Sequence, residues 1–230
     1  MKILCTICAR KGSKEIVNKN LLKLGKKLLI DFTIEQAKKS NMFDKIVIST
    51  DSKKIKELTK KKVDLVIKRP SFLSRDKSPK IPAIKHSLLS SENFFLKTFD
   101  LIVDLDVTSP LRDIKDIKNS IKIFKKKKSS NLVSVTISKR NPYFNMIKKK
   151  GKSFSLVKKT SKNIYSRQTA PKIYELNASI YIWNRSALLR SRSLIGNKTT
   201  IYEMPAERSI DIDSKLDLSI VKHLILKKKN

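Results

Sequence analysis

A short apolar run near the start of the chain, residues 3–9, ends abruptly in a basic loop, and this change constrains the fold more than any other feature. The run ILCTICA has no charge and contains several β-branched residues, which is typical of a buried strand. The loop after it holds one glycine, two hydroxyl or amide side chains and four cations: Gly12, Ser13, Asn20, Arg10, Lys11, Lys14 and Lys19. In α/β proteins such loops bind phosphate groups. A basic surface loop without a ligand is the alternative.

Apolar runs alternate with amphipathic stretches along much of the chain. Further strands are predicted over residues 45–50, 63–67, 100–107, 131–138 and 178–183. Helices are predicted over residues 28–40, 53–61, 84–95, 114–126 and 216–226. This alternation predicts an α/β fold with a mostly parallel, doubly wound sheet, in which ligands bind beyond the C-terminal ends of the strands. We expect residues 1–230 to form a single domain, with an inserted arm at about 139–176 that is too long for a plain connection.

The net charge of +33 would attract any polyanion. The lysines are spread over the whole chain, however, and no aromatic-interleaved patch or nucleic-acid-binding motif accompanies them. Nucleic-acid binding therefore remains only an alternative. No segment approaches the ~18 apolar residues of a membrane span, and no signal-peptide pattern precedes the first strand, so we expect a cytoplasmic protein without a membrane partner.

Two extended segments each carry a pair of aspartates with one residue between them. Asp104 and Asp106 project from one face of the strand at 100–107, and Asp106 is expected at the mouth of the sheet, where a cation could meet it. Helix capping with surface ion pairs is the alternative there. Asp211 and Asp213 share one side of residues 209–213, and such hard oxygen ligands suit Mg²⁺ together with water and phosphate. Capping of the last helix would explain Asp213 but not Asp211.

The basic loop and the two acidic segments together meet the needs of a nucleotidyl-transfer site. Cations and Mg²⁺ hold a triphosphate while a hydroxyl group attacks in line, so the protein does little covalent work itself. The chain lacks the G-x-x-x-x-G-K-[ST] motif, which excludes a P-loop ATPase.

Several motifs taken together resemble the acylneuraminate cytidylyltransferase (CMP-sialic acid synthetase) family. They are ARKGSK-x4-KN, FDKIVISTDS, RP-x2-LS, TSPLR, NASIYIW and SIDIDSKLDL, in the family's order and spacing. The resemblance covers nearly the whole chain. It implies a Rossmann-like nucleotidyltransferase fold that forms a homodimer through its inserted arm. It also implies transfer of CMP from CTP to the anomeric hydroxyl of a nonulosonic acid, with release of pyrophosphate, to supply activated sugar for surface glycan synthesis.

The resemblance also assigns roles to residues. Those implied to hold the triphosphate and cytidine are Arg10, Ser13, Lys14, Lys19 and Asn20, with Arg69 and Ser78 bordering the nucleotide. Those implied to meet the sugar acid are Tyr143, Arg167, Gln168 and Asn177. Asp211 and Asp213 would bind Mg²⁺. During catalysis Arg10 and Lys14 would offset charge on the pyrophosphate, and Asp106 would bind a second Mg²⁺ or help deprotonate the sugar hydroxyl.

Three positions depart from the family pattern. Glu15 and Asn18 stand where the family usually has small or glycine residues, and Asp106 replaces the glutamine of typical sialate enzymes. The LDVTSPLR and RNPYFNMI segments resemble relatives that act on legionaminic-type sugars. We therefore expect an N-acylneuraminate cytidylyltransferase-like enzyme with a nonulosonate substrate, with CMP-legionaminate and CMP-pseudaminate synthases as candidates within that class. The alternative is a relative that binds CTP without catalysis.

Overall fold

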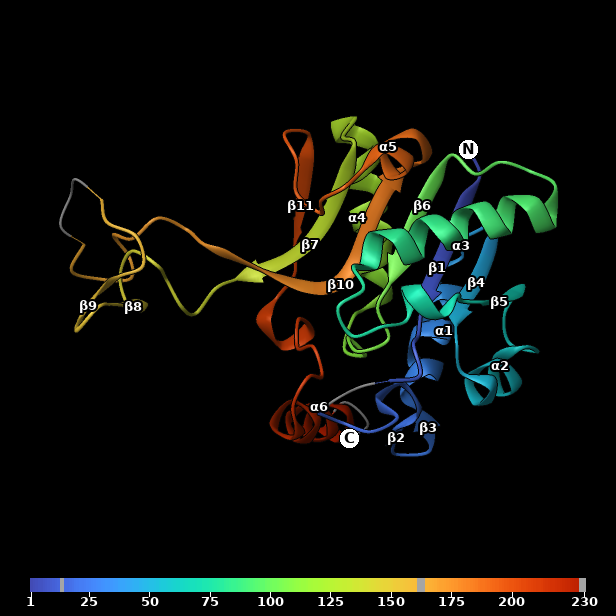
Figure 1. The fold of residues 1–230 in the computed structure, drawn as a ribbon, viewed down its shortest axis with the longest axis horizontal. Helices are drawn as coiled ribbons and strands as arrows, with labels where there is room; N and C mark the ends of the chain where they lie inside the picture. Colours follow the sequence, from blue (N-terminus) through green and yellow to red (C-terminus); the bar gives the residue numbers. More distant parts are fainter. Residues whose placement is uncertain (13–14, 161–163, 228–230) are drawn as a thin grey trace.

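A seven-stranded sheet forms the centre of the protein in a computed structural model that describes residues 1–12, 15–160 and 164–227 (Figure 1). From one edge to the other its strands are β11 (Thr199–Glu203), β7 (Asn131–Ile137), β10 (Tyr174–Asn184), β6 (Leu101–Leu105), β1 (Ile3–Cys8), β4 (Lys45–Thr50) and β5 (Leu65–Lys68). Strand β10 runs antiparallel to both β6 and β7, whereas every other neighbouring pair is parallel. The expected mostly parallel sheet is therefore present.

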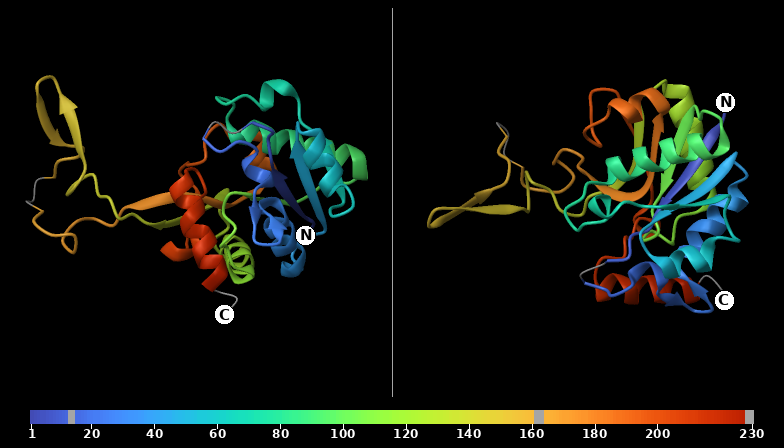
Figure 2. Two further views of the ribbon diagram at one scale, coloured as in Figure 1. Left: turned by 90° about the horizontal axis from the view of Figure 1, so that it is seen from below. Right: turned by 45° about the vertical axis from the view of Figure 1, so that its right-hand side comes forward.

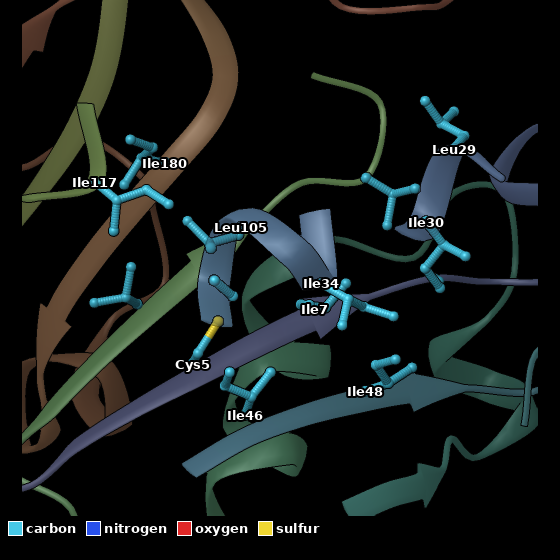
Figure 3. Close-up of a cluster of buried hydrophobic side chains, with 14 of the residues drawn as sticks. Cys5, Ile7, Leu29, Ile30, Ile34, Ile46, Ile48, Leu105, Ile117 and Ile180 are labelled. Carbon is cyan, nitrogen blue, oxygen red and sulfur yellow. The ribbon is translucent and has the colours of Figure 1, made fainter. Parts of the chain in front are cut away.

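Helices cover both faces of this sheet, as the two further views show (Figure 2). Buried side chains on one face come from α1 (Leu29–Ser40), α2 (Lys53–Thr59), α4 (Ile114–Lys127) and α6 (Lys215–Lys227). Those on the other face come from α3 (Lys80–Phe95) and α5 (Arg185–Arg190). In the larger cluster, Ile7 and Leu105 from the sheet lie among helical side chains such as Ile34 (Figure 3). This burial of apolar surface on both sides of the sheet stabilises the doubly wound arrangement.

Short elements connect the main ones. They are η1 (Lys19–Leu21), β2 (Lys23–Leu24), β3 (Lys27–Leu28), η2 (Ser71–Leu73) and η3 (Ala206–Arg208). Helix α2 is capped by Ser52, whose Oγ accepts a hydrogen bond from Ile55 N, and helix α4 is capped by Asp113. Strand β11 and helix α5 were not predicted from the sequence. None of the helices in the described part of the chain is both long and apolar enough to cross a membrane.

Helix α3 begins four residues earlier than the sequence predicts, so the expected start at residue 84 is wrong. Its first residue is Lys80, and Pro82 lies within its first turn. Proline is tolerated there because the first N–H groups of a helix have no partner inside the helix. Lys80 therefore belongs to a helix that packs against the sheet and does not lie in a loop.

The inserted segment between β7 and β10 extends away from the sheet (Figures 1 and 2). It contains a hairpin of β8 (Ile147–Lys150) and β9 (Ser153–Leu156), with Gly151 in the left-handed region at φ 61°. Large apolar side chains on the hairpin are exposed, with Ile147 at 65% and Phe154 at 67%. We call residues 139–176 the arm; that it joins two copies of the chain remains a prediction.

Candidate active site

A cleft lies at the edge of the sheet where three parallel strands end. Arg10 follows β1, Arg69 follows β5 and Asp106 follows β6, so they meet at the edge where doubly wound proteins bind ligands. The cavity has a volume of about 280 Å³. Most of the residues predicted for nucleotide and metal binding line it: Arg10, Lys19, Asn20, Arg69, Ser78, Asp106, Asp211 and Asp213. The structure thus brings the basic loop and both acidic segments to one cavity.

Polar contacts hold the basic loop at the mouth of the cavity. Asn20 Nδ2 donates a hydrogen bond to the backbone oxygen of Arg10 at 2.9 Å. The Arg10 guanidinium donates from Nη1 to the backbone oxygen of Arg75 at 2.9 Å and lies 3.2 Å from the Asp76 carboxylate. Arg10 therefore connects the loop after β1 to the loop before α3, and residues of both loops line the cavity.

The same loop contains two of the three positions that depart from the family pattern, Glu15 and Asn18. Asn18 has φ 53° and ψ 36°, a left-handed conformation that glycine adopts most easily and that asparagine tolerates better than most residues. Asparagine therefore preserves the backbone shape expected of a glycine. Glu15 is exposed and does not line the cavity. Ser13 and Lys14, which the resemblance assigns to the triphosphate, lie outside the described residues.

The N-terminal and C-terminal parts of the chain meet across the cleft. Lys19 Nζ lies 2.9 Å from Asp213 Oδ1, and Ile212 N donates a hydrogen bond to Thr108 O at 3.0 Å. Ile212 is fully buried in the larger apolar cluster. Because neighbours in an extended segment point to opposite sides, Asp211 and Asp213 both lie on the cavity side, as the sequence predicts.

Asp211 has the environment of a carboxylate that needs a cation. Its Oδ1 is buried and has no hydrogen-bond partner among the described residues. Burial, together with the charges of Asp106 and Asp213, raises the pKa of Asp211 to about 6, against the smaller lowering effects of the Thr108 side chain and the Lys19 charge. A divalent cation would remove this penalty, so the pair of Asp211 and Asp213 fits Mg²⁺, which needs only one or two protein carboxylates when phosphate and water complete its shell.

The described residues contain no larger cluster of metal-binding side chains besides the pair of Asp211 and Asp213. Among the described residues, no group of three or more histidine, cysteine, aspartate or glutamate side chains is arranged to hold a metal ion. Cys5 is buried in the larger cluster and Cys8 packs against the smaller one, so they lie on opposite faces of β1. The C-x-x-C pattern therefore reflects core packing.

The other predicted carboxylate, Asp106, already has a cation next to it. Lys80 Nζ lies 2.6 Å from Asp106 Oδ2 and 2.8 Å from Asp104 Oδ2. Burial alone would raise the pKa of Asp106, but Lys80 and the donors of Thr108 outweigh it and lower that pKa to about 2. Burial alone would likewise lower the pKa of Lys80, but the two carboxylates hold it well above its usual value. The sequence predicted a cation at the mouth of the sheet but did not identify this lysine.

A second buried cation, Arg112, supports the segment that carries Asp106. It donates from Nη1 to Ser179 O at 2.6 Å and from Nη2 to Gln36 Oε1 at 3.0 Å and Asp106 O at 3.3 Å. Burial lowers the pKa of Arg112 to about 10. Arg112 is the last residue of the TSPLR motif. Its structural role could not be recognised from the sequence, because its partners come from distant parts of the chain.

Arg69 and Ser78 border the cavity, as expected for the edge of a nucleotide site. Arg69 is buried, and it donates from Nε to Ser49 Oγ at 3.1 Å and from Nη2 to Ser49 O at 2.7 Å. Ser78 Oγ donates to Phe72 O at 2.7 Å. Both residues therefore have fixed positions at the cavity wall.

The residues predicted for the sugar acid are not at this cavity. Tyr143, Arg167 and Gln168 belong to the arm, and the last two are exposed. Asn177 is buried, where its Oδ1 accepts from Ser134 Oγ at 2.6 Å and its Nδ2 donates to Ser209 Oγ at 2.9 Å. The structure thus uses Asn177 to connect β10 to the segment before Asp211, and a direct contact with sugar remains untested.

Similarity to known proteins extends over nearly the whole chain. The family model described as cytidylyltransferase matches residues 4–229. Post-translational flagellin modification protein B of Campylobacter coli is 43% identical over 99% of this chain and 96% of its own length. CMP-N,N'-diacetyllegionaminic acid synthase of Campylobacter jejuni subsp. jejuni is 42% identical over 97% of this chain and 95% of its own length.

A solved structure shares the fold. CMP:2-keto-3-deoxy-manno-octonic acid synthetase complexed with CTP superposes with a TM-score of 0.74, over 99% of this chain and all of that chain. The two sequences are 14% identical, so this similarity concerns the fold alone. It confirms the Rossmann-like architecture that the sequence predicts.

Proposed function

The chain belongs to the cytidylyltransferase family and is a nucleotidyltransferase, and from this premise we propose that it transfers CMP from CTP to a nonulosonic acid. The anomeric hydroxyl of the sugar acid attacks the α-phosphate, the new ester bond forms, and pyrophosphate leaves. One observation carries this proposal: the basic loop after β1 and the acidic segment before α6 line one cavity and contact each other through Lys19 and Asp213. A triphosphate with a divalent cation needs both kinds of group.

Residues of this cavity have separate roles in the proposal. Arg10 and Lys19 bind the triphosphate, together with Ser13 and Lys14, which the resemblance alone assigns. Asp211 and Asp213 hold Mg²⁺, which, when bound, offsets negative charge on the phosphates. Beside the cytidine lie Asn20, Arg69 and Ser78. Their fixed positions at the cavity wall limit the poses of the nucleotide and so reduce the entropy cost of reaction.

A legionaminic-type sugar is the substrate that the relatives favour. The chain is 42% identical to a protein named CMP-N,N'-diacetyllegionaminic acid synthase, and both chains are covered almost completely. The LDVTSPLR segment, with Asp106, agrees with this choice. We propose that the product serves as activated sugar for the synthesis of surface glycans.

The experiment is a pyrophosphate-release assay with CTP and Mg²⁺ and a panel of sugar acids. The panel contains N-acetylneuraminic, N,N'-diacetyllegionaminic, pseudaminic and 3-deoxy-manno-octulosonic acids. We expect release with CTP but not with ATP, and the highest kcat/KM with the legionaminic acid. CTP binding without release from any acid would indicate a non-catalytic relative. Salt-dependent RNA binding at sub-micromolar Kd without any effect of CTP would favour the nucleic-acid alternative.

We also propose that the arm forms a homodimer and completes the site of the partner. Its exposed apolar side chains, such as Ile147, Phe154 and Tyr165, have no cover in the described part of this chain, and Arg167 lies on the arm rather than at the cavity. An arginine fork suits the carboxylate of a sugar acid. Contact of the arm with a second copy would bury the apolar side chains and supply Arg167 in the same step.

Mixing two inactive variants tests this arrangement. Asp211→Asn damages the cavity and Arg167→Ala damages the arm, so each variant alone should be nearly inactive. In an equal mixture after subunit exchange, mixed dimers contain one site built from two intact parts. We expect about a quarter of the wild-type activity to return, given random pairing of a two-fold dimer. No recovery from a mixture shown to contain mixed dimers would contradict a site shared between subunits.

A further inference from the structure

Lys80 lies between the carboxylates of Asp104 and Asp106, of which that of Asp106 lines the cavity. It is the first residue of α3, and its Nζ lies 2.8 Å from Asp104 Oδ2 and 2.6 Å from Asp106 Oδ2. The ring of Tyr181 lies beneath it, with 4.8 Å between Nζ and the ring centroid. The side chain of Lys80 is 24% exposed and lines the cavity, whereas that of Asp104 is completely buried.

Each oxygen of these two carboxylates has a hydrogen-bond or ion-pair partner, and Asp104 Oδ2 has only the ion pair with Lys80. Thr6 Oγ1 donates to Asp104 Oδ1 at 2.8 Å, and Thr108 donates from N and Oγ1 to Asp106 Oδ1 at 3.1 and 2.9 Å. Lys80 contacts the remaining oxygen of each carboxylate. A divalent cation at this place would have to displace the ammonium group.

The carboxylates of Asp211 and Asp213 have fewer protein partners. Asp211 Oδ1 is buried without a partner among the described residues, and Asp213 has only the contact with Lys19 at its Oδ1. Asp106, Asp211 and Asp213 line one cavity, and among them Asp211 has a buried oxygen that no described residue contacts by a hydrogen bond or an ion pair. Many enzymes that act on phosphates instead place two divalent cations about 4 Å apart in the site.

We infer that Lys80 is a built-in cation that takes the place of a second divalent ion, so that the site uses one metal ion, held by Asp211 and Asp213. This inference rests on the proposed function. Lys80 is a positioning residue: it offsets one of the two negative charges of Asp104 and Asp106 beside the triphosphate and occupies the place between them that a metal ion would need. Its contact with Asp106 Oδ2, together with the two Thr108 donors at Oδ1, stabilises the charged form of Asp106 and makes this carboxylate a weaker base toward the sugar hydroxyl.

A count of bound metal separates this role from that of an ordinary structural ion pair. Mn²⁺ is titrated into the full-length protein at saturating CTP, and bound Mn²⁺ is measured by electron paramagnetic resonance. We expect one Mn²⁺ per bound CTP in the wild type and two in Lys80→Met, because the substitution opens the Asp104 and Asp106 pair. The matched control is Lys77→Met, an exposed lysine of the preceding loop, which should keep one.

Two Mn²⁺ per bound CTP in the wild type would overturn the inference, and so would a single Mn²⁺ in a folded Lys80→Met protein. If Lys80→Met does not fold, the wild-type count and Asp106→Asn decide. Asp106→Asn should retain one Mn²⁺, and loss of that ion would place the metal at Asp106 and overturn the inference. A protein that binds no CTP would overturn the proposed function itself, which is a different result from CTP binding with two metal ions.

Discussion

Two segments of this protein carry the same pattern, Asp-x-Asp in an extended conformation, yet their environments are opposite. In the closed pair, Asp104 and Asp106, every carboxylate oxygen has a hydrogen-bond or ion-pair partner, and Lys80 offsets one of the two negative charges. In the open pair, Asp211 and Asp213, one oxygen is buried without a partner among the described residues. An Asp-x-Asp pattern alone therefore does not assign a role, because contacts from distant parts of the chain determine the environment of each carboxylate.

The two pairs also contribute differently to stability. A buried carboxylate paired with an ammonium group and hydroxyl donors stabilises the folded chain relative to one left unpaired. A buried carboxylate among other carboxylates costs free energy until a cation binds. We therefore expect substitutions in the closed pair to damage the fold and substitutions at Asp211 to damage catalysis.

The largest expected effect is on turnover at the open pair. Asp211→Ala should lower kcat by about 1,000-fold, or about 4 kcal/mol in the activation barrier, because the Mg²⁺ site is lost. The pyrophosphate-release assay measures this effect, and far-UV circular dichroism checks the fold. Glu57→Ala, on the surface of α2, is the control that should keep wild-type turnover. Activity of Asp211→Ala near that of the wild type would remove the metal assignment.

The next largest effect is on stability at the closed pair. Asp104→Ala should lower the free energy of unfolding by about 3 kcal/mol, because it leaves Thr6 without its acceptor and takes one carboxylate from Lys80. Urea denaturation provides the measurement. The matched control is Asp213→Ala, whose carboxylate is 72% exposed, and it should change stability by no more than about 0.5 kcal/mol. Equal effects of the two substitutions would remove the distinction between the pairs.

A smaller effect concerns acid stability. The folded-state pKa of Asp106 is about 2, below its usual value of 3.8, so its contribution to stability is present above about pH 4 and is lost as the pH falls toward 2. This contribution is about 2 kcal/mol. Urea unfolding of the wild type and Asp106→Asn at pH 5, 4 and 3 should show the wild-type advantage shrinking with decreasing pH. An advantage that does not depend on pH would contradict the low pKa.

The smallest expected effect is an increase in the free energy of unfolding. Without metal at pH 7.5, Asp211→Asn should raise the free energy of unfolding by about 1 kcal/mol, because it removes a charge whose pKa is raised by burial and by neighbouring carboxylates. Thermal denaturation with and without Mg²⁺ and CTP measures the change. The ligands should stabilise the wild type more than the variant. A destabilised Asp211→Asn protein without ligands would contradict the description of an open pair.

Much of the fold could be predicted from the sequence because the central strands are short, continuous apolar runs. The family resemblance drawn from the motifs is confirmed by a family model that matches residues 4–229 and by relatives at 42 and 43% identity. Strand β11 was missed because it is an edge strand with only partly buried or exposed residues, so it shows no apolar run. Helix α5 is only six residues long, too short for a clear periodic pattern.

Many of the cavity residues could be named from the sequence, but the contacts of Lys80 and Arg112 could not. Local alternation was enough to place Asp211 and Asp213 on one side of their segment. Lys80 was missed because the helix was expected to begin only at residue 84, after Pro82, whereas proline is compatible with the first turn of α3. Its contacts with Asp104 and Asp106 join residues more than 20 positions apart, and no local pattern reports such a contact. Similarly, Arg112 belongs to a recognised motif, but its partners come from α1 and β10.

The location of the bound metal ion would show directly whether Asp211 and Asp213, rather than Asp104 and Asp106, hold it. Crystals of the wild-type protein grown with CTP and Mn²⁺, measured at the manganese absorption edge, would show each bound ion as a peak in the anomalous difference map. Our account predicts one peak, between the carboxylates of Asp211 and Asp213, with Lys80 still in contact with Asp104 and Asp106. A peak between Asp104 and Asp106 with Lys80 displaced, or no peak at Asp211, would contradict it.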